Sequence, residues 1–126
     1  MKKVISSANA PAAIGPYSQA ILSNGTLYSS GQIAIDPITN ELITDSISNE
    51  THRVMKNLKA VLEAASMNFS QVVKCTIFLK DMNQYAEINT IYSLYFDENP
   101  PAREAVQVSM LPKNVNVEIS LIASNK

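Results

Sequence analysis

Hydrophobic and polar residues alternate along two stretches near the end of the chain, residues 105–110 and residues 115–123. The apolar positions fall at every second residue: Val106, Val108 and Met110, then Val115, Val117, Ile119, Leu121 and Ala123. A period of two is typical of a β-strand with one buried face. Residues 111–114 (Leu-Pro-Lys-Asn) have the composition of a turn. If the two strands form a hairpin, residues near 107 lie opposite Glu118.

Two other stretches have the three- and four-residue spacing of amphipathic helices. The clearer one covers residues 47–65, and either Asp45 or Ser46 can cap its N-terminus. The second runs from about Gln84 to Phe96 and is rich in tyrosine. The paired prolines at 100–101 end this second helix because proline cannot continue it.

The remaining strands are expected at residues 3–6, 18–23, 26–33 and 72–79, with an Asn24-Gly25 hairpin turn between the second and third. The order β-β-β-α-β-α-β-β predicts one α+β domain over residues 1–126, a mixed sheet with both helices on one face. The other face is expected to carry Ala105, Gln107, Asn116, Glu118 and Ser120. Such a face is too polar for a monomer core and has few charges, so it predicts a symmetric oligomer.

Composition and charge exclude several classes of function. The net charge is −1 and the ten basic residues form no stripe, which argues against nucleic acid as the main ligand. No apolar run is long enough to cross a membrane, and no signal peptide is visible. The single cysteine, Cys75, cannot form an internal disulfide and fits a reducing compartment, so a cytoplasmic location is expected.

Arg103 and Glu118 are the strongest candidates for chemistry. A guanidinium binds a carboxylate with two parallel hydrogen bonds, and a covered glutamate has the raised pKa that suits acid–base catalysis. Both residues fall at the polar positions of the alternating pattern in their strands. Both are therefore expected to point into one cleft that takes a small acidic substrate. Two alternatives remain open: Arg103 is a surface residue, and Glu118 is solvated or paired with Lys113.

Other reactive side chains give weaker signals. His52 has no second ligand at metal spacing and is expected to be a solvated surface residue, so no metal site is predicted. Cys75 alternates with apolar neighbours and is expected in the core. The small residues Ser30 and Gly31 end a strand, where they would let backbone N–H groups approach a ligand.

Several segments resemble the Rid (YjgF-type) reactive-intermediate deaminases along nearly the whole chain. They are Gly15-Pro16-Tyr17-Ser18-Gln19-Ala20, Ser30-Gly31-Gln32-Ile33, residues 57–65 (NLKAVLEAA), Pro101-Ala102-Arg103 through Leu111-Pro112, and Val117-Glu118-Ile119. The resemblance implies a chorismate-mutase-like α+β fold, assembled as a homotrimer with clefts between subunits. It also implies hydrolysis of enamines and imines, which pyridoxal-phosphate enzymes such as threonine dehydratase release, to 2-keto acids and ammonia without a cofactor.

The resemblance also implies roles for particular residues. Arg103 would bind the substrate carboxylate and Glu118 would activate the attacking water. Five further positions would bind substrate: Tyr17, Ser30, Gly31, Asn89 and Ala105. The well-studied deaminases read Pro-Ala-Arg-Ser-Cys where this chain reads Pro-Ala-Arg-Glu-Ala. Ala105 replaces a cysteine, and the acidic Glu104 could pair with Arg103, so a non-catalytic trimer that binds a small carboxylate and regulates another protein remains an alternative.

Overall fold

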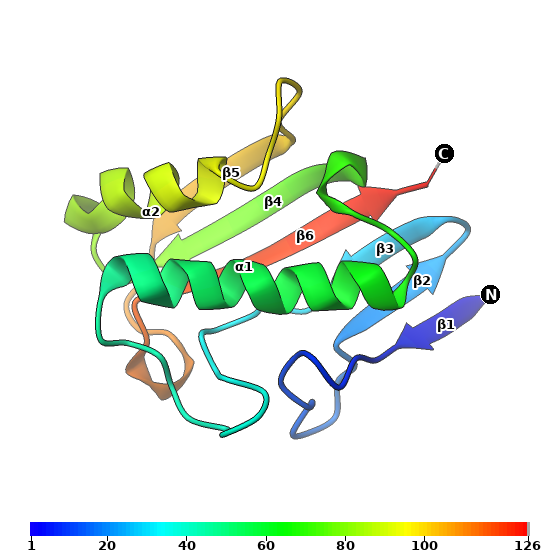
Figure 1. Ribbon diagram of the computed structural model, residues 1–126, viewed down its shortest axis with the longest axis horizontal. Coiled ribbons are helices and arrows are strands. Elements are labelled where there is room, and N and C mark those ends of the chain that lie inside the picture. Colours follow the sequence, from blue (N-terminus) through cyan, green and yellow to red (C-terminus); the bar gives the residue numbers. More distant parts are fainter. Residues whose placement is uncertain (126) are drawn as a thin grey trace.

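Six strands form one mixed sheet in the computed structural model, which describes residues 1–125 (Figure 1). The order across the sheet is β1-β2-β3-β6-β4-β5. The strands are β1 (Lys2–Ile5), β2 (Ala20–Ser23), β3 (Thr26–Ser29), β4 (Val72–Leu79), β5 (Ala102–Gln107) and β6 (Val117–Ser124). Every predicted strand is therefore present, although the pair around Asn24-Gly25 is shorter than its apolar pattern suggested.

Two helices pack side by side on one face of the sheet, α1 (Ile47–Ala64) and α2 (Tyr85–Ser93) (Figure 1). Ser46, one of the two expected caps, accepts a hydrogen bond from the Asn49 N–H and begins α1. The second helix begins after the 3₁₀ turn η2 (Met82–Gln84), which Asp81 caps. Two further 3₁₀ turns, η1 (Phe69–Gln71) and η3 (Pro112–Asn114), precede β4 and β6. The α+β arrangement with both helices on one face is confirmed.

The predicted hairpin between the last two strands is wrong. β5 pairs with β4 in parallel, and β6 pairs antiparallel with β4 and with β3. The helix α2 provides the crossover that joins two parallel neighbours, as a β-α-β unit requires. Alternation of apolar residues indicates that a segment is a strand, but it does not identify the neighbouring strand.

The expected buried face of β5 is also reversed. Arg103 is in register with Cys75 and Ala105 with Ile77, two fully buried residues beneath the helices. In-register residues of neighbouring strands point to the same side of a sheet. Ala105 and Arg103 therefore face the helices, whereas Val106 points to the uncovered face and is 44% exposed.

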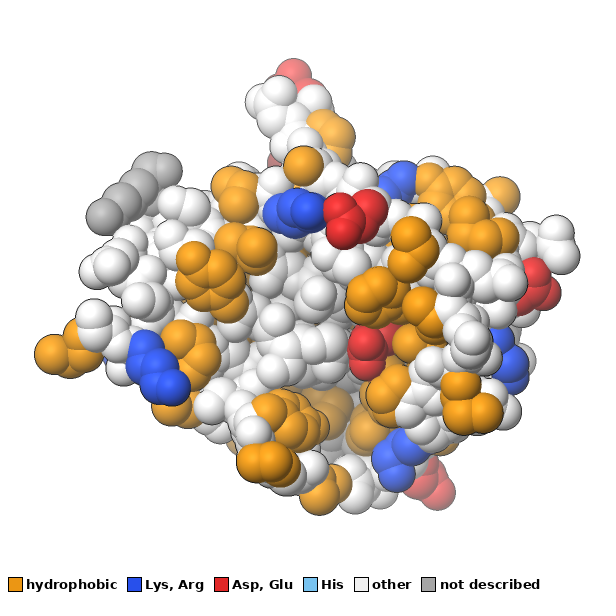
Figure 2. All heavy atoms as spheres, turned by 180° about the vertical axis from the view of Figure 1, so that it is seen from behind, with side chains coloured by type: hydrophobic (Ala, Val, Ile, Leu, Met, Phe, Trp, Pro, Cys, Tyr) orange, Lys and Arg blue, Asp and Glu red, His pale blue; other side chains and the backbone are white. Residues whose placement is uncertain are grey.

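Two more residues expected on the uncovered face lie on the helix side. Gln107 is in register with the buried Leu79, and its Oε1 accepts a hydrogen bond from the N–H of Met82 in η2. Asn116 donates hydrogen bonds to Glu50 of α1. Of the five residues predicted on the uncovered face, only Glu118 and Ser120 lie there, because they alternate along β6 with residues buried beneath the helices. Hydrophobic side chains gather around a hollowed central area of that face (Figure 2).

A buried carboxylate ties the first helix to the start of β6. Glu50 is fully buried, and its two oxygens accept hydrogen bonds from the backbone and side-chain nitrogens of Asn116 and from the Val117 N–H. Ionised carboxylates form strong hydrogen bonds to amide donors, and buried donors that lose their acceptor are costly. Glu50 therefore fixes the backbone that immediately precedes Glu118.

Replacing Glu50 with alanine should lower the free energy of unfolding by about 3 kcal/mol, because buried N–H donors lose their acceptors. Urea unfolding followed by circular dichroism measures the change. The control is Glu63→Ala, which removes an exposed carboxylate from the same helix and should change stability little. Equal midpoints for the two variants would contradict the structural role of Glu50.

Candidate functional site

Arg103 lies between β5 and α2, where aromatic and amide side chains surround its guanidinium. Its Nη1 donates to Asn89 Oδ1 at 2.5 Å, and its Nη2 donates to the hydroxyl of Tyr85. The Arg103 Cζ is 5.4 Å from the ring centre of Tyr85 and 5.1 Å from that of Tyr92. Aromatic faces at these distances stabilise a cation. Arg103 is therefore a positioned, half-buried charge, and the alternative of a plain surface arginine is wrong.

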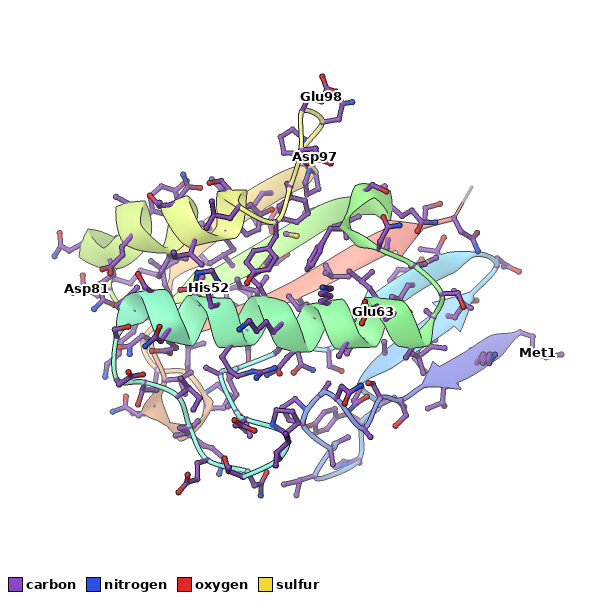
Figure 3. All side chains as sticks on the ribbon, viewed as in Figure 1. Met1, His52, Glu63, Asp81, Asp97 and Glu98 are labelled. Carbon is purple, nitrogen blue, oxygen red and sulfur yellow. The ribbon has the colours of Figure 1, made fainter. Side chains whose placement is uncertain are left out.

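A cavity of about 360 Å³ opens beside this guanidinium. Its lining comes from α2, the loop that follows it and the start of β5: Asn89, Tyr92, Ser93, Phe96, Asp97, Pro100, Pro101 and Arg103. Asp97 and Glu98 lie on that loop, which projects beyond the sheet (Figure 3). Burial raises the pKa of the Tyr92 phenol well above its usual range, so Tyr92 stays neutral beside Arg103. Arg103 is the one cation lining this cavity.

Ala105 contributes its backbone to the same edge of the sheet. β5 is the outermost strand and pairs on one side only, with β4. The Val108 N–H donates to the Leu79 carbonyl, and donors on one side of a strand recur at every second residue. The N–H of Ala105 therefore points away from β4, toward the free edge. An interaction through this N–H needs no cysteine side chain, so the Ala105 replacement leaves it intact.

Glu118 lies on the opposite face of the sheet, beside a cavity of about 630 Å³. Its lining comes from three loop regions and from Glu118 itself: Pro11, Ala12, Ile14, Tyr17, Gln19, Ser30, Gly31, Gln32, Ile33, Ile35, Pro112, Lys113 and Glu118. Burial raises the pKa of the Glu118 carboxyl above its ordinary value. A raised pKa favours a carboxyl group that takes up and releases a proton near neutral pH.

Gly31 lies directly against the Glu118 carboxyl group. A Cβ added at Gly31 would lie 2.7 Å from the carboxyl carbon and 2.9 Å from Oε1. Carbon atoms do not approach to this distance, so a larger residue at position 31 would displace the glutamate. The φ angle of Gly31 lies outside the left-handed range, so the site requires the small size of glycine here and not its backbone freedom.

Tyr17 and Ser30 complete this second group of predicted residues. Tyr17 is 54% exposed and lines the Glu118 cavity. The Ser30 hydroxyl donates to the Ser18 carbonyl at 2.6 Å, and the Ser30 N–H donates to the Gln19 carbonyl. Ser30 therefore joins the end of β3 to the segment just before β2. The buried Gln19 side chain holds residues 7–11 through hydrogen bonds to the backbone of Ser7, Ala10 and Pro11.

The predicted site residues therefore form two half-sites on opposite faces of the sheet. The arginine half-site contains Arg103, Asn89 and Ala105, and the glutamate half-site contains Glu118, Gly31, Ser30 and Tyr17. The prediction that Arg103 and Glu118 point into one cleft of the same chain is wrong. The argument from alternating polar positions assumed that β5 and β6 pair as a hairpin, but β4 lies between them. A single chain cannot bring both groups to one small ligand.

The acidic Glu104 does not pair with Arg103. It points to the uncovered face, where its carboxylate lies 2.9 Å from the Lys74 ammonium. This is the one ion pair within residues 1–125, so Lys113 does not pair with Glu118. The departure at position 104 therefore leaves the arginine half-site unobstructed.

The remaining reactive residues have structural partners. Cys75 is fully buried, as expected, and burial raises the pKa of its thiol. His52 is not simply solvated, because its Nδ1 is hydrogen-bonded to the Tyr95 hydroxyl at 2.7 Å.

In the part of the chain that the structure describes, no three His, Cys, Asp or Glu side chains gather as metal ligands. No helix of that part is long and apolar enough to span a membrane.

Sequence reasoning missed two residues that shape these half-sites. Tyr85 lies in the predicted tyrosine-rich helix and had no assigned role, yet its hydroxyl contacts Arg103. Glu50 is a charged residue on the buried side of α1 and had no assigned role, yet it holds the start of β6. The signal for Tyr85 was its polar atom at the first residue of α2, one turn before Asn89. No local pattern links Glu50 to Asn116, which is 66 residues away in sequence.

The Gly31→Ala variant should displace the Glu118 carboxyl group toward solvent and return its pKa toward the ordinary glutamate value. Carboxyl-carbon NMR titration of Glu118 measures this pKa in both proteins. Ser30→Ala is the control, because the Ser30 hydroxyl bonds Ser18 and not Glu118. An unchanged Glu118 titration in Gly31→Ala would contradict the close contact.

The chain is similar in sequence and in structure to several known proteins. The family model described as Endoribonuclease L-PSP matches residues 7–125. The chain is 46% identical to the human 2-iminobutanoate/2-iminopropanoate deaminase, over 98% of this chain and 90% of that protein. It is 49% identical, over 98% of both chains, to a Lactococcus lactis protein whose name describes a regulator, AldR. The crystal structure of YyfA from Yersinia pestis, a protein of the Rid family, superimposes with a TM-score of 0.96 at 49% identity, covering 98% of this chain and 99% of that chain. The chain belongs to the Endoribonuclease L-PSP family, which is the YjgF/Rid family that its sequence motifs resemble.

Proposed function

We propose that this protein is a 2-iminobutanoate/2-iminopropanoate deaminase, which hydrolyses reactive imines and enamines to 2-keto acids and ammonia. The observation that carries the proposal is the arginine half-site, where a fixed guanidinium lines a cavity and forms no ion pair with the nearby acids Asp97 and Glu104. A small 2-imino acid offers one carboxylate for this cation. The name of the human relative supports the same substrate class.

Glu118 has the role of proton acceptor and donor. Its carboxylate removes a proton from water as the water oxygen bonds to the imine carbon. The protonated Glu118 then gives that proton to the nitrogen, which yields a carbinolamine. Glu118 next takes the proton of the carbinolamine hydroxyl group and passes it to the amine nitrogen, so that the carbon–nitrogen bond breaks and ammonia and a 2-keto acid are released. A carboxyl group with a raised pKa suits both directions of transfer. Addition of water and loss of ammonia conserve the oxidation state, so the reaction needs no cofactor.

The two half-sites meet between neighbouring subunits of a homotrimer. One subunit supplies Arg103 at the edge of its sheet, and the next supplies Glu118 from its uncovered face. That face exposes large apolar side chains, among them Val4, Tyr28 and Val106. Burying apolar surface of this kind against another subunit favours association. A cytoplasmic trimer placed beside pyridoxal-phosphate dehydratases would receive their released intermediates.

A second candidate is a trimer that binds a small carboxylate and regulates another protein without turnover. The regulator name of the Lactococcus lactis relative favours this alternative. It uses the same Arg103 half-site for the ligand and assigns no proton transfer to Glu118. Measurement of turnover separates the two candidates.

Cleavage of RNA is not proposed, although the family description names an endoribonuclease. A phosphodiester backbone needs several clustered cations, and the net charge of −1 with dispersed basic residues does not supply them.

A coupled assay tests the proposal. Threonine dehydratase and threonine generate the 2-aminocrotonate/2-iminobutanoate pair, and semicarbazide traps the imine that escapes hydrolysis. The wild-type protein should suppress the trapped product. Arg103→Ala should reduce the suppression at least 100-fold, because the carboxylate loses its charged partner, and Glu118→Gln should reduce it through the loss of the proton acceptor.

Lys59→Ala is the control, because it removes an exposed cation from α1 that lies outside both half-sites. Circular dichroism and the oligomer mass of each variant show whether the fold is kept. A folded wild-type oligomer without turnover would exclude the deaminase and favour the regulatory trimer.

A further inference from the structure

We propose that the Tyr85 hydroxyl is a second hydrogen-bond donor for the substrate carboxylate, beside the Arg103 guanidinium. The proposal rests on the proposed function and assigns Tyr85 as a binding residue of the same site. Tyr85 is the first residue of α2, and its hydroxyl accepts a hydrogen bond from Arg103 Nη2. The carboxylate would then contact Arg103 and Tyr85 together.

The hydrogen-bonding capacity of the hydroxyl gives the first argument. A phenol has one hydrogen to donate and lone pairs that accept. Arginine only donates, so the bond with Arg103 uses a lone pair of Tyr85 and leaves the phenol hydrogen free. Among the hydrogen bonds of residues 1–125, none is donated by the Tyr85 hydroxyl. The free hydrogen therefore stands beside a guanidinium, where an anionic oxygen is the most favourable acceptor.

Asn89 gives the second argument. Its Oδ1 accepts from Arg103 Nη1, so its amide nitrogen carries two hydrogens that face away from the guanidinium. That nitrogen has no hydrogen-bond partner among the residues that the structure describes. The phenol hydrogen of Tyr85, the amide hydrogens of Asn89 and the remaining N–H groups of Arg103 are all donors. Donors from these three side chains, gathered around one guanidinium, fit a ligand that has only acceptors, and an ionised carboxylate is such a ligand.

The position of Tyr85 is fixed independently of any ligand. The 3₁₀ turn before it is capped by Asp81, and the Met82 N–H donates to Gln107 Oε1 on β5. These contacts join the start of α2 to the same strand that carries Arg103. The hydroxyl is therefore held beside the guanidinium before a ligand arrives, which reduces the entropy lost on binding.

A chemical consequence for the substrate follows. A 2-imino acid with a free carboxylate satisfies the donors, whereas the corresponding amide brings its own N–H groups against them. Donors that face other donors are left unpaired, and such mismatches discriminate strongly between substrates. The site should therefore accept 2-imino acids and reject 2-imino amides.

The test compares Tyr85→Phe with wild type in the coupled assay. The variant keeps the ring that lies over Arg103 and removes the donor, so KM should rise about tenfold while kcat changes little. Tyr95→Phe is the matched control, because it removes a hydrogen-bonded phenol hydroxyl that contacts His52 instead. Tyr95→Phe should leave KM at the wild-type value.

A binding measurement makes the outcome independent of turnover. Isothermal titration with 2-ketobutyrate should show about tenfold weaker binding to Tyr85→Phe than to wild type, and 2-ketobutyramide should bind neither detectably. Equal affinities of wild type and Tyr85→Phe for 2-ketobutyrate would overturn the role of Tyr85. Wild type that binds 2-ketobutyrate in this way but lacks turnover would overturn the deaminase function and leave the Tyr85 inference standing.

Discussion

Side chains of successive residues in a β-strand point to opposite faces of the sheet, and this constraint decides what one subunit of the protein can do. Arg103 is in register with the buried Cys75 and points to the helices. Glu118 is in register with Phe78 on β4 and points to the uncovered face. The sheet thus separates the cation from the carboxyl group, and no side-chain rotation in one chain can bring them together. Assembly is therefore part of the proposed chemistry.

Within one chain, each half-site is ordered by contacts to its main charged group. On the helix face, Asn89 and Tyr85 of α2 accept hydrogen bonds from the Arg103 guanidinium and hold it in place. On the uncovered face, the missing side chain of Gly31 leaves the space that the Glu118 carboxyl group fills. The buried Glu50 fixes the backbone just before Glu118 from the opposite side of the sheet. Groups held in this way lose little freedom when a ligand binds.

Local sequence patterns predicted the elements well because each pattern reports a local property. The spacing of apolar residues in 47–65 indicates one buried helix face, and the structure has α1 at Ile47–Ala64. The neighbours of each strand are not local, so the same reasoning paired β5 with β6 and placed Val106 in the core. The structure instead exposes Val106 on the face that a neighbouring subunit would cover. Its apolar character fits the proposed assembly, whereas reasoning from a single chain interpreted it as a core residue.

The site residues followed a similar division. Arg103, Glu118 and Gly31 could be chosen from their residue types, their strand positions and the family resemblance. The hydroxyl of Tyr85 and the carboxylate of Glu50 act through contacts between segments 18 and 66 residues apart, which no sequence window contains. Long-range contacts of this kind need the three-dimensional arrangement.

Subunit mixing tests most directly whether each active site combines Arg103 of one subunit with Glu118 of another. Arg103→Ala and Glu118→Gln proteins, each inactive alone, are unfolded together in equal amounts and refolded as mixed oligomers. In a cyclic assembly, random mixing gives about a quarter of the sites both intact groups, so about a quarter of wild-type turnover should return. No recovery in oligomers shown by mass spectrometry to be mixed would contradict a site shared between subunits.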